Sequence, residues 1–122
     1  MKSRNVIARK IAPLLFAGNT AVIKEKVERA RKIVEQLQQE KIDRSLFTDN
    51  ANSYFDQQAL QDFAASLSPL GISQDFQQTA EQLRGGMTYR AYRAKFAEKV
   101  LAISTYEMPD GKIEQFLVSV GN

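Results

Sequence analysis

The chain has 122 residues and a net charge of +3, with 43% hydrophobic and 25% charged residues, which is typical of one soluble globular domain. It contains neither cysteine nor histidine, so disulfides, thiolate nucleophiles, zinc–thiolate sites and imidazole bases are excluded. Any acid–base chemistry would rest on carboxylates, Tyr or Lys. The sequence therefore predicts no metal site and no cofactor, and no catalytic residue can be assigned from it.

Charge is distributed unevenly along the chain. Residues 1–20 contain four basic residues and no acid, whereas residues 45–83 contain five acidic residues and no base. The acids are Asp49, Asp56, Asp62, Asp75 and Glu81. The basic start could contact an acidic surface, a nucleic acid or a membrane, or it could be a solvated helix end, which is the simpler interpretation.

No stretch of 18 apolar residues exists, so we expect no transmembrane segment. Residues 6–21 resemble an export signal only in part, because Arg9 and Lys10 interrupt the apolar run and Pro13 lies inside it. We therefore expect a soluble protein without such a signal. The composition does not distinguish a cytoplasmic from a periplasmic location.

The first twenty residues predict a short helical arm. Apolar residues recur at helical spacing from Val6 to Leu15, and Pro13 predicts that this helix starts or kinks nearby. The run from Ala17 to Thr20 predicts a break, because Gly18 can close one helix and the threonine can cap the next. We expect an arm over residues 1–20, followed by one α+β domain over residues 21–122.

The clearest predicted element is a helix from about Ala21 to Lys41. Its apolar residues form one stripe, consisting of Ile23, Val27, Ala30, Ile33, Val34 and Leu37. Charged residues cover the opposite face, including the favourable pair Glu28–Lys32. The stripe spans only about three heptads, so a helix that faces the core is favoured over a coiled coil.

Cap-type residues organise the segment that follows. Asp43 and Thr48 predict a short, locally capped stretch over residues 42–55. Asp56 then caps a third helix, whose predicted buried face consists of Leu60, Phe63, Ala64 and Leu67. Ser68-Pro69-Leu70-Gly71 ends that helix, because proline cannot continue it and glycine permits the chain to reverse.

After Gly71 the apolar period changes from 3.6 to 2, which predicts four strands. The predicted strands are Phe76–Arg84, Met87–Phe96, Val100–Met108 and Ile113–Val120. Short turns join them, at Gly85-Gly86, near Ala97-Glu98 and at Pro109-Asp110-Gly111, so neighbouring strands should be antiparallel. The fold class is therefore α+β, with N-terminal helices packed on a curled four-stranded antiparallel sheet.

The stretch from Asp43 to Asn122 also carries a family resemblance, chiefly in FAASLSPLG (63–71), RGGM (84–87), residues 89–93 and PDGKIEQF (109–116). It resembles the SnoaL-like and ketosteroid-isomerase-like superfamily of cystatin-like domains, in particular small bacterial domains of unknown function. The resemblance implies a cone-shaped sheet with a pocket, in a domain that stands alone or follows a serine hydrolase domain of the β-lactamase type.

Some members of this superfamily are isomerases, cyclases or dehydratases that place an Asp or His base against Tyr or Asp acids. Many others are non-enzymatic and use the sheet to dimerise or to hold a partner. Because this chain has no His and no Asp that aligns with such a base, the resemblance assigns no catalytic residue here.

The densest polar and aromatic cluster is Tyr89, Arg90, Tyr92 and Arg93. On a strand, Arg90 and Tyr92 share one face while Tyr89 and Arg93 share the other, so one pair could bind an anionic ligand at a pocket mouth. The alternative is an ordinary amphipathic strand whose arginines pair with Glu98, Glu107 or Glu114. Single-stranded nucleic acid is disfavoured as a partner, because the chain has no second strand of this kind.

Tyr54, Tyr106 and Glu107 are the remaining candidates, because a Tyr–carboxylate pair in a dry pocket can transfer protons. The alternative is core aromatics with hydroxyls at the rim. Together these residues predict a non-catalytic binding or dimerisation module, which could be accessory to a hydrolase. Its partner would be a second copy, an attached domain, or a small anionic or apolar ligand. The alternative function is a small-molecule pocket protein or an isomerase-like enzyme of the SnoaL-like type.

Overall fold

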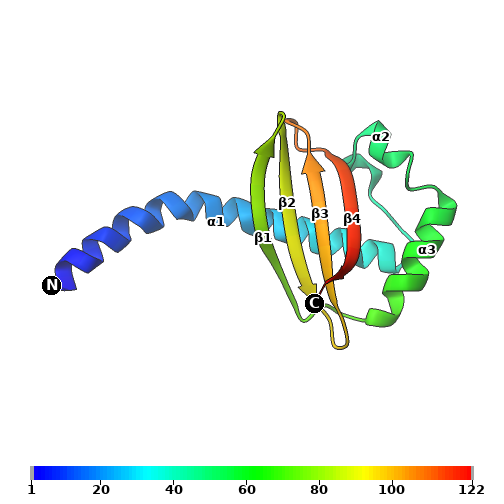
Figure 1. The fold of residues 1–122 in the computed structure, drawn as a ribbon, viewed down its shortest axis with the longest axis horizontal. Helices are drawn as coiled ribbons and strands as arrows, with labels where there is room; N and C mark the ends of the chain where they lie inside the picture. The colour runs from blue at the N-terminus through cyan, green and yellow to red at the C-terminus, as the bar shows by residue number, and fades with distance from the viewer. Residues whose placement is uncertain (1, 122) are drawn as a thin grey trace.

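The computed structural model describes the backbone of residues 2–121 and the side chains of residues 20–121. Helices come first and a four-stranded antiparallel sheet comes last (Figure 1). The predicted α+β class is therefore confirmed. The sheet is open rather than closed into a barrel, since its first and last strands do not pair with each other.

The first helix, α1, spans Lys2–Gln38 without interruption. The predicted break at residues 17–20 and a helix start near Pro13 are therefore wrong. A glycine inside a helix costs only about 1 kcal/mol, which the surrounding helical turns can offset. The side chains of the apolar residues between Val6 and Leu15 lie outside the described part, and the division into an arm and a domain stays a prediction.

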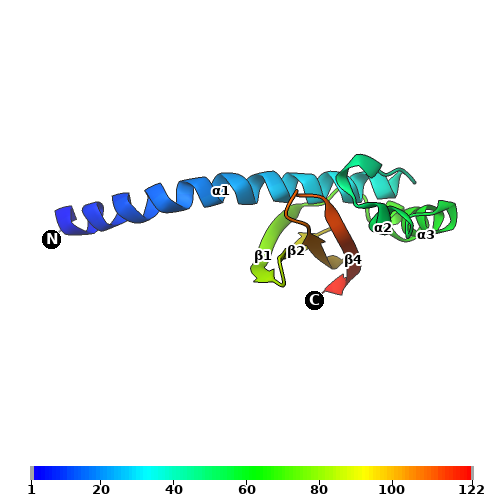
Figure 2. The same cartoon turned by 90° about the horizontal axis from the view of Figure 1, so that it is seen from above.

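The C-terminal half of α1 anchors the fold. The apolar stripe predicted for this helix is confirmed, since five of its residues are at most 8% exposed: Val27, Ala30, Ile33, Val34 and Leu37. The helix crosses one face of the sheet, as Figures 1 and 2 show from two directions. This stripe is the main cover for the sheet, as the amphipathic pattern predicts.

A hydrogen-bonded cap ends α1 slightly before the predicted Lys41. The Lys41 amide donates to the Gln36 carbonyl at 2.8 Å, and the Glu40 amide donates to the Leu37 carbonyl at 3.0 Å. Glu40 takes the left-handed conformation that this motif requires, with φ 62°. The chain therefore turns sharply away from the helix axis at this point.

Short helices fill the segment between α1 and the sheet, and three of the four are capped by the residues that predict them. They are η1 (Arg44–Leu46), α2 (Asp49–Asn52), α3 (Gln57–Leu67) and η2 (Ser68–Leu70). The side chains of Asp43, Thr48 and Asp56 each accept a backbone N–H at a helix start. Gly71 ends the segment with φ 77°, a conformation that favours glycine.

α3 is fastened to α1 by one amide side chain. The Gln38 Nε2 atom donates to the carbonyls of Leu67 and Gly71, at 3.0 and 2.8 Å. Leu60 and Leu67 bury the apolar face of α3, and Phe63 packs against the same core. These contacts hold α3 beside the sheet rather than beneath it (Figure 2).

The four strands form a meander in which each pairs with the next. They are β1 (Asp75–Arg84), β2 (Met87–Lys95), β3 (Val100–Glu107) and β4 (Ile113–Gly121), each within one residue of its predicted bounds. β1 and β4 are the edges of the sheet. The Gly85-Gly86 turn has both residues at positive φ, 58° and 86°, as a two-residue hairpin requires.

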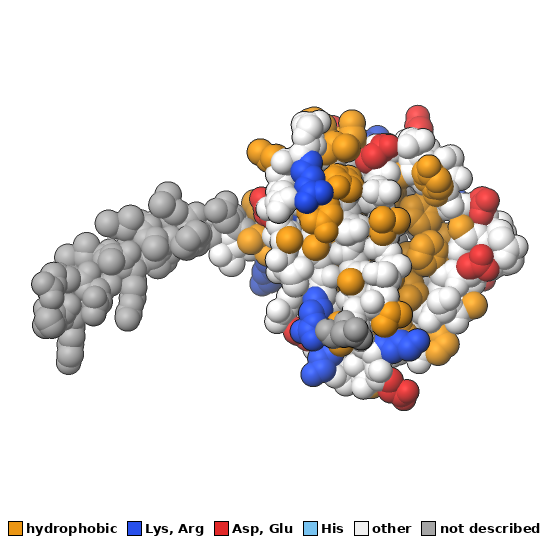
Figure 3. Space-filling view, viewed as in Figure 1, with side chains coloured by type: hydrophobic (Ala, Val, Ile, Leu, Met, Phe, Trp, Pro, Cys, Tyr) orange, Lys and Arg blue, Asp and Glu red, His pale blue; other side chains and the backbone are white. Residues whose placement is uncertain are grey.

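The two faces of the sheet differ in cover. The inner face packs on α1 and buries Tyr92, Ile103 and Phe116 at 6% exposure or less. Residues one position along each strand, such as Tyr89 and Tyr106, lie on the outer face. No helix of the described chain covers the outer face, which is the face turned toward the viewer in Figures 1 and 3.

Candidate functional site

The structure separates the residues that the sequence singles out. Arg90 and Tyr92 lie buried on the inner face, at 6% and 2% exposure. Tyr89 and Tyr106 lie side by side on the outer face, 5.3 Å apart between ring centroids. Arg93 also lies on the outer face and is exposed, whereas Tyr54 lies after α2 and is 72% exposed. They therefore do not form a single site.

A buried ion cluster occupies the inner face around Glu107. Its Oε2 atom accepts from Arg29 at 2.8 Å and from Arg90 at 3.1 Å, and its Oε1 atom lies 3.2 Å from the Lys26 ammonium. Glu107 is only 4% exposed. Because two of these cations come from α1 and one from β2, the cluster joins the helix to the sheet.

The Arg90 guanidinium binds acceptors on two sides, since its Nε atom donates to Glu107 and its NH1 atom donates to β1. Its NH1 atom donates to Glu81 at 2.8 Å and to Gln78 at 3.0 Å. Burial, and secondly the nearby charge of Glu107, raises the pKa of Tyr92 to about 12. The pairing of Arg90 with Glu107 that the sequence offered as an alternative is confirmed, and the side chains of Arg90 and Tyr92 are both buried.

The proposed Tyr–carboxylate pair does not assemble. Tyr106 and Glu107 are consecutive on β3, so their side chains point to opposite faces of the sheet. Both carboxylate oxygens of Glu107 already accept cationic donors. Proton transfer between these two groups is therefore not supported.

The outer face carries a small cation–aromatic cluster. The Arg84 guanidinium lies 4.7 Å from the ring centroid of Tyr89, and its NH1 atom donates to the Tyr106 hydroxyl at 3.2 Å. The arginine is exposed at the end of β1. This cluster links the end of β1 to tyrosine side chains of β2 and β3.

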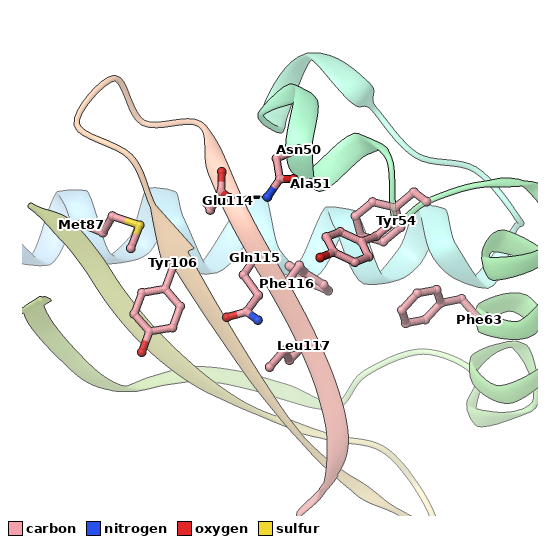
Figure 4. Close-up of a pocket in the computed structure, with 11 residues that line it drawn as sticks. Asn50, Ala51, Tyr54, Phe63, Met87, Tyr106, Glu114, Gln115, Phe116 and Leu117 are labelled. Atoms are coloured by element: carbon pink, nitrogen blue, oxygen red, sulfur yellow. Dashed lines mark hydrogen bonds between the residues drawn. The ribbon is translucent and has the colours of Figure 1, made fainter. Parts of the chain in front are cut away.

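An apolar cleft lies between β4 and the α2–α3 segment, and we call it the β4 cleft. Its volume is about 550 Å³, within the usual range for ligand sites. Figure 4 shows Tyr54 and Phe63 on the helical side, with Tyr106 and Leu117 on the strand side. Figure 3 shows it as a hollow lined with hydrophobic side chains beside α3. The cleft is open to the surface and is therefore accessible to a ligand.

One carboxylate stands at the end of the β4 cleft nearest α2. Glu114 accepts from the Thr48 hydroxyl at 2.8 Å and from the Asn50 amide at 2.6 Å. These two hydrogen bonds, the first being the stronger influence, lower the pKa of Glu114 from its ordinary value. Glu114 is therefore an ionised acceptor at neutral pH and a weak proton acceptor.

A register shift explains the position of this carboxylate. Glu107 pairs with Ile113 and Tyr106 pairs with Gln115, so Glu114 is an extra residue in β4. Such a bulge re-aims a side chain, here toward α2. The sequence offered no signal for the bulge. It did identify Thr48 as a cap residue, but not as the hydrogen-bond donor to Glu114.

Chemically, the cleft is suited to binding an apolar or aromatic group. Its lining is mainly aromatic and aliphatic, with Glu114 as its single carboxylate.

Among the residues that the structure describes, no group of three or more carboxylates gathers to hold a metal ion. Within the same part of the chain, no helix is both long and apolar enough to cross a membrane.

Comparison with known proteins does not assign the chain to a family. No protein-family model, no curated protein and no solved structure matches the chain.

Proposed function

We propose that the domain is a non-catalytic binding module and that the β4 cleft is its binding site. The single observation that carries this proposal is the accessible aromatic cleft of about 550 Å³ with one ionised carboxylate at its end. Apolar walls with few convergent polar groups are the usual pattern of a ligand site. The buried Glu107 cluster, in contrast, has its donors and acceptors matched within the fold.

The charge of the cleft favours a ligand that is both aromatic and cationic. We therefore choose two probes that share a phenyl ring and differ in charge, 2-phenylethylammonium and 3-phenylpropionate. In NMR titrations, the ammonium probe should shift the amides of Tyr54, Phe63 and Leu117, and it should bind more tightly than the carboxylate. A ring–ring contact contributes about 0.5–1.5 kcal/mol, so Tyr54→Ala should weaken binding by roughly 2–10-fold.

The matched control is Ile72→Ala, which removes another exposed apolar side chain outside the cleft. It should leave the binding of the ammonium probe unchanged. Absence of shifts in the cleft, or equal losses in both variants, would contradict the proposal.

A second candidate is a small-molecule pocket protein that takes an anionic ligand on the outer face. A shallow groove of about 630 Å³ lies there, lined by Ala91, Ser104 and Ser119 with Arg93 at its side. Phenylpropionate shifts centred on this groove would favour that function.

An isomerase-like enzyme would have to use Glu114 as its base with Tyr54 or Tyr106 as the acid, since these side chains line the same cleft. The hydrogen bonds from Thr48 and Asn50 lower the pKa of Glu114 and make it a weak base, so binding is the function that we favour.

The proposal extends to dimerisation or docking through the sheet, and to attachment behind a hydrolase domain, as the SnoaL-like resemblance implies. The uncovered outer face supports this extension, since Leu117 there is 53% exposed. Sedimentation velocity at increasing concentration should then show a dimer, which Leu117→Lys should weaken. A monomer at every concentration would rule out dimerisation through this face.

A further inference from the structure

The edge of β4 that lines the cleft is open. β4 is the last strand in the sheet, so only one of its edges pairs with β3. On the other edge, the Thr48 amide donates to the Ile113 carbonyl at 3.0 Å, where Phe47 forms a single parallel bridge. From residue 114 to residue 121, no backbone hydrogen bond from another described segment reaches this edge. An edge of this kind presents unpaired N–H and C=O groups to a new strand.

The cleft has the place and lining that an added strand needs. Neighbouring strands lie about 4.8 Å apart, so a fifth strand on β4 would run through the cleft itself. Its side chains would alternate between the outer face, beside Leu117, and the inner side, beside Phe116 and Phe63. Both sides are apolar, so the lining favours apolar side chains in the strand.

The helices beside the edge argue for a single strand and against a second folded copy. α2 and α3 stand next to β4 in both views of the ribbon (Figures 1 and 2). A second domain could not bring its own sheet edge against β4 without displacing them. An extended segment of peptide has the width of one strand and meets no such obstacle.

The negative charge beside the cleft indicates which charged side chains a bound peptide should carry. Glu114 is ionised at one end of the cleft, and the adjoining segment contributes Asp49, Asp56 and Asp62. Residues 45–83 contain no base, and Arg44, which donates to the Asn52 and Phe55 carbonyls, offsets only one of these negative charges. Figure 3 shows acidic side chains over α2 and α3. A Lys or Arg in the occupant would therefore be attracted to this wall.

We propose that the β4 cleft binds an extended peptide segment of a partner protein, apolar and carrying Lys or Arg, which pairs with β4 as a fifth strand. This inference rests on the proposed binding function of the same cleft. Strand addition of this kind takes affinity from main-chain hydrogen bonds and specificity from the alternate side chains. The open edge of β4 and the acidic side chains beside it therefore indicate the class of partner, which the apolar lining alone does not.

The test uses a synthetic acetylated and amidated hexapeptide that alternates lysine and valine. NMR titration should give shifts along β4 and at Tyr54, and hydrogen exchange of the β4 amides that face the cleft should slow at least fivefold on binding. A matched peptide that alternates glutamate and valine should bind at least tenfold more weakly. Glu114→Gln should reduce the preference for the lysine peptide.

Two further peptides test the backbone pairing separately from the side chains. Each carries N-methyl groups at alternate residues, which remove the N–H donors along one edge while keeping the lysine and valine side chains. At least one of them should bind at least tenfold more weakly than the parent peptide. Equal binding of both N-methylated peptides, or unchanged exchange of the β4 amides, would overturn strand addition.

The outcomes separate this inference from the function on which it rests. If the phenylethylammonium probe binds the cleft while the peptides fail these tests, the binding module stands and strand addition is wrong. If neither the ammonium probe nor the lysine peptide shifts the cleft residues, both proposals are wrong.

Discussion

The two faces of β2 use the same residue types in opposite ways. On the inner face, Arg90 and Tyr92 are buried, and the arginine is paired with Glu107 and Glu81. On the outer face, Tyr89 and Arg93 are accessible, and the ring of Tyr89 lies against that of Tyr106, which lines the β4 cleft. A side chain's place on the alternating strand, rather than its type, therefore decides whether it serves stability or lies near a binding surface.

The largest effect should come from Glu107. Glu107→Gln removes the charge that Lys26, Arg29 and Arg90 share, and breaking a buried ion pair on one side costs about 3–5 kcal/mol. Urea unfolding should show this loss in the free energy of unfolding. The control Glu98→Gln alters an exposed carboxylate in the β2–β3 turn and should change stability by no more than about 0.5 kcal/mol. Similar effects of both substitutions would contradict a structural role for the cluster.

Tyr92 predicts a loss of stability at high pH. Its pKa is raised from 10.0 to about 12 in the fold, so above pH 10 the unfolded chain releases this proton first. Stability is therefore fully present below pH 10 and falls as the pH rises toward 12, by about 2–3 kcal/mol at 1.36 kcal/mol per pKa unit. The difference in unfolding free energy between the protein and Tyr92→Phe should shift by this amount over that range. A constant difference would show that Tyr92 is not the titrating group.

A matched pair of arginines tests the two faces directly. Arg90→Met removes charged hydrogen bonds inside the fold and should cost about 2–3 kcal/mol. Arg84→Met removes an exposed cation–aromatic contact on the outer face and should cost about 0.5–1 kcal/mol. Thermal and urea unfolding of the two variants would measure this difference. Equal losses would remove the distinction between the faces.

The smallest effect concerns Glu114 at low pH. Its pKa lies below the ordinary 4.5, because Thr48 and Asn50 donate to its carboxylate. The stability from these contacts is therefore present above pH 4.5 and is lost as the pH falls through the lower folded pKa. The advantage of the protein over Glu114→Gln should shrink on acidification below pH 4.5. An advantage that grows on acidification would contradict the sign of this shift.

Much of the fold follows from local patterns. The strands were predictable because the residues alternate in polarity, and the turns because Gly85, Gly86 and Gly111 supply the positive φ that hairpins need. The break expected at Gly18 failed, because a propensity of about 1 kcal/mol is a weak signal within a long helix. The curled cone and the cystatin-like assignment remain predictions.

The candidate site was far less predictable. Its walls come from the turn after α2, from α3 and from β4, and the Thr48–Glu114 contact joins residues 66 positions apart. The bulge that positions Glu114 depends on the register between β3 and β4, which no local pattern specifies. Tyr54 and Tyr106 were named from the sequence as ligand-binding candidates and possible acid–base groups, but nothing local indicated that they lie on opposite walls of one cleft.

The most direct test of the account compares binding and stability in Tyr54→Ala. This side chain is 72% exposed, so its removal should change the free energy of unfolding by no more than about 0.5 kcal/mol. The dissociation constant for 2-phenylethylammonium, measured by NMR on the same sample, should rise by roughly 2–10-fold. An unchanged dissociation constant in a fully folded variant would contradict the claim that the β4 cleft is the binding site.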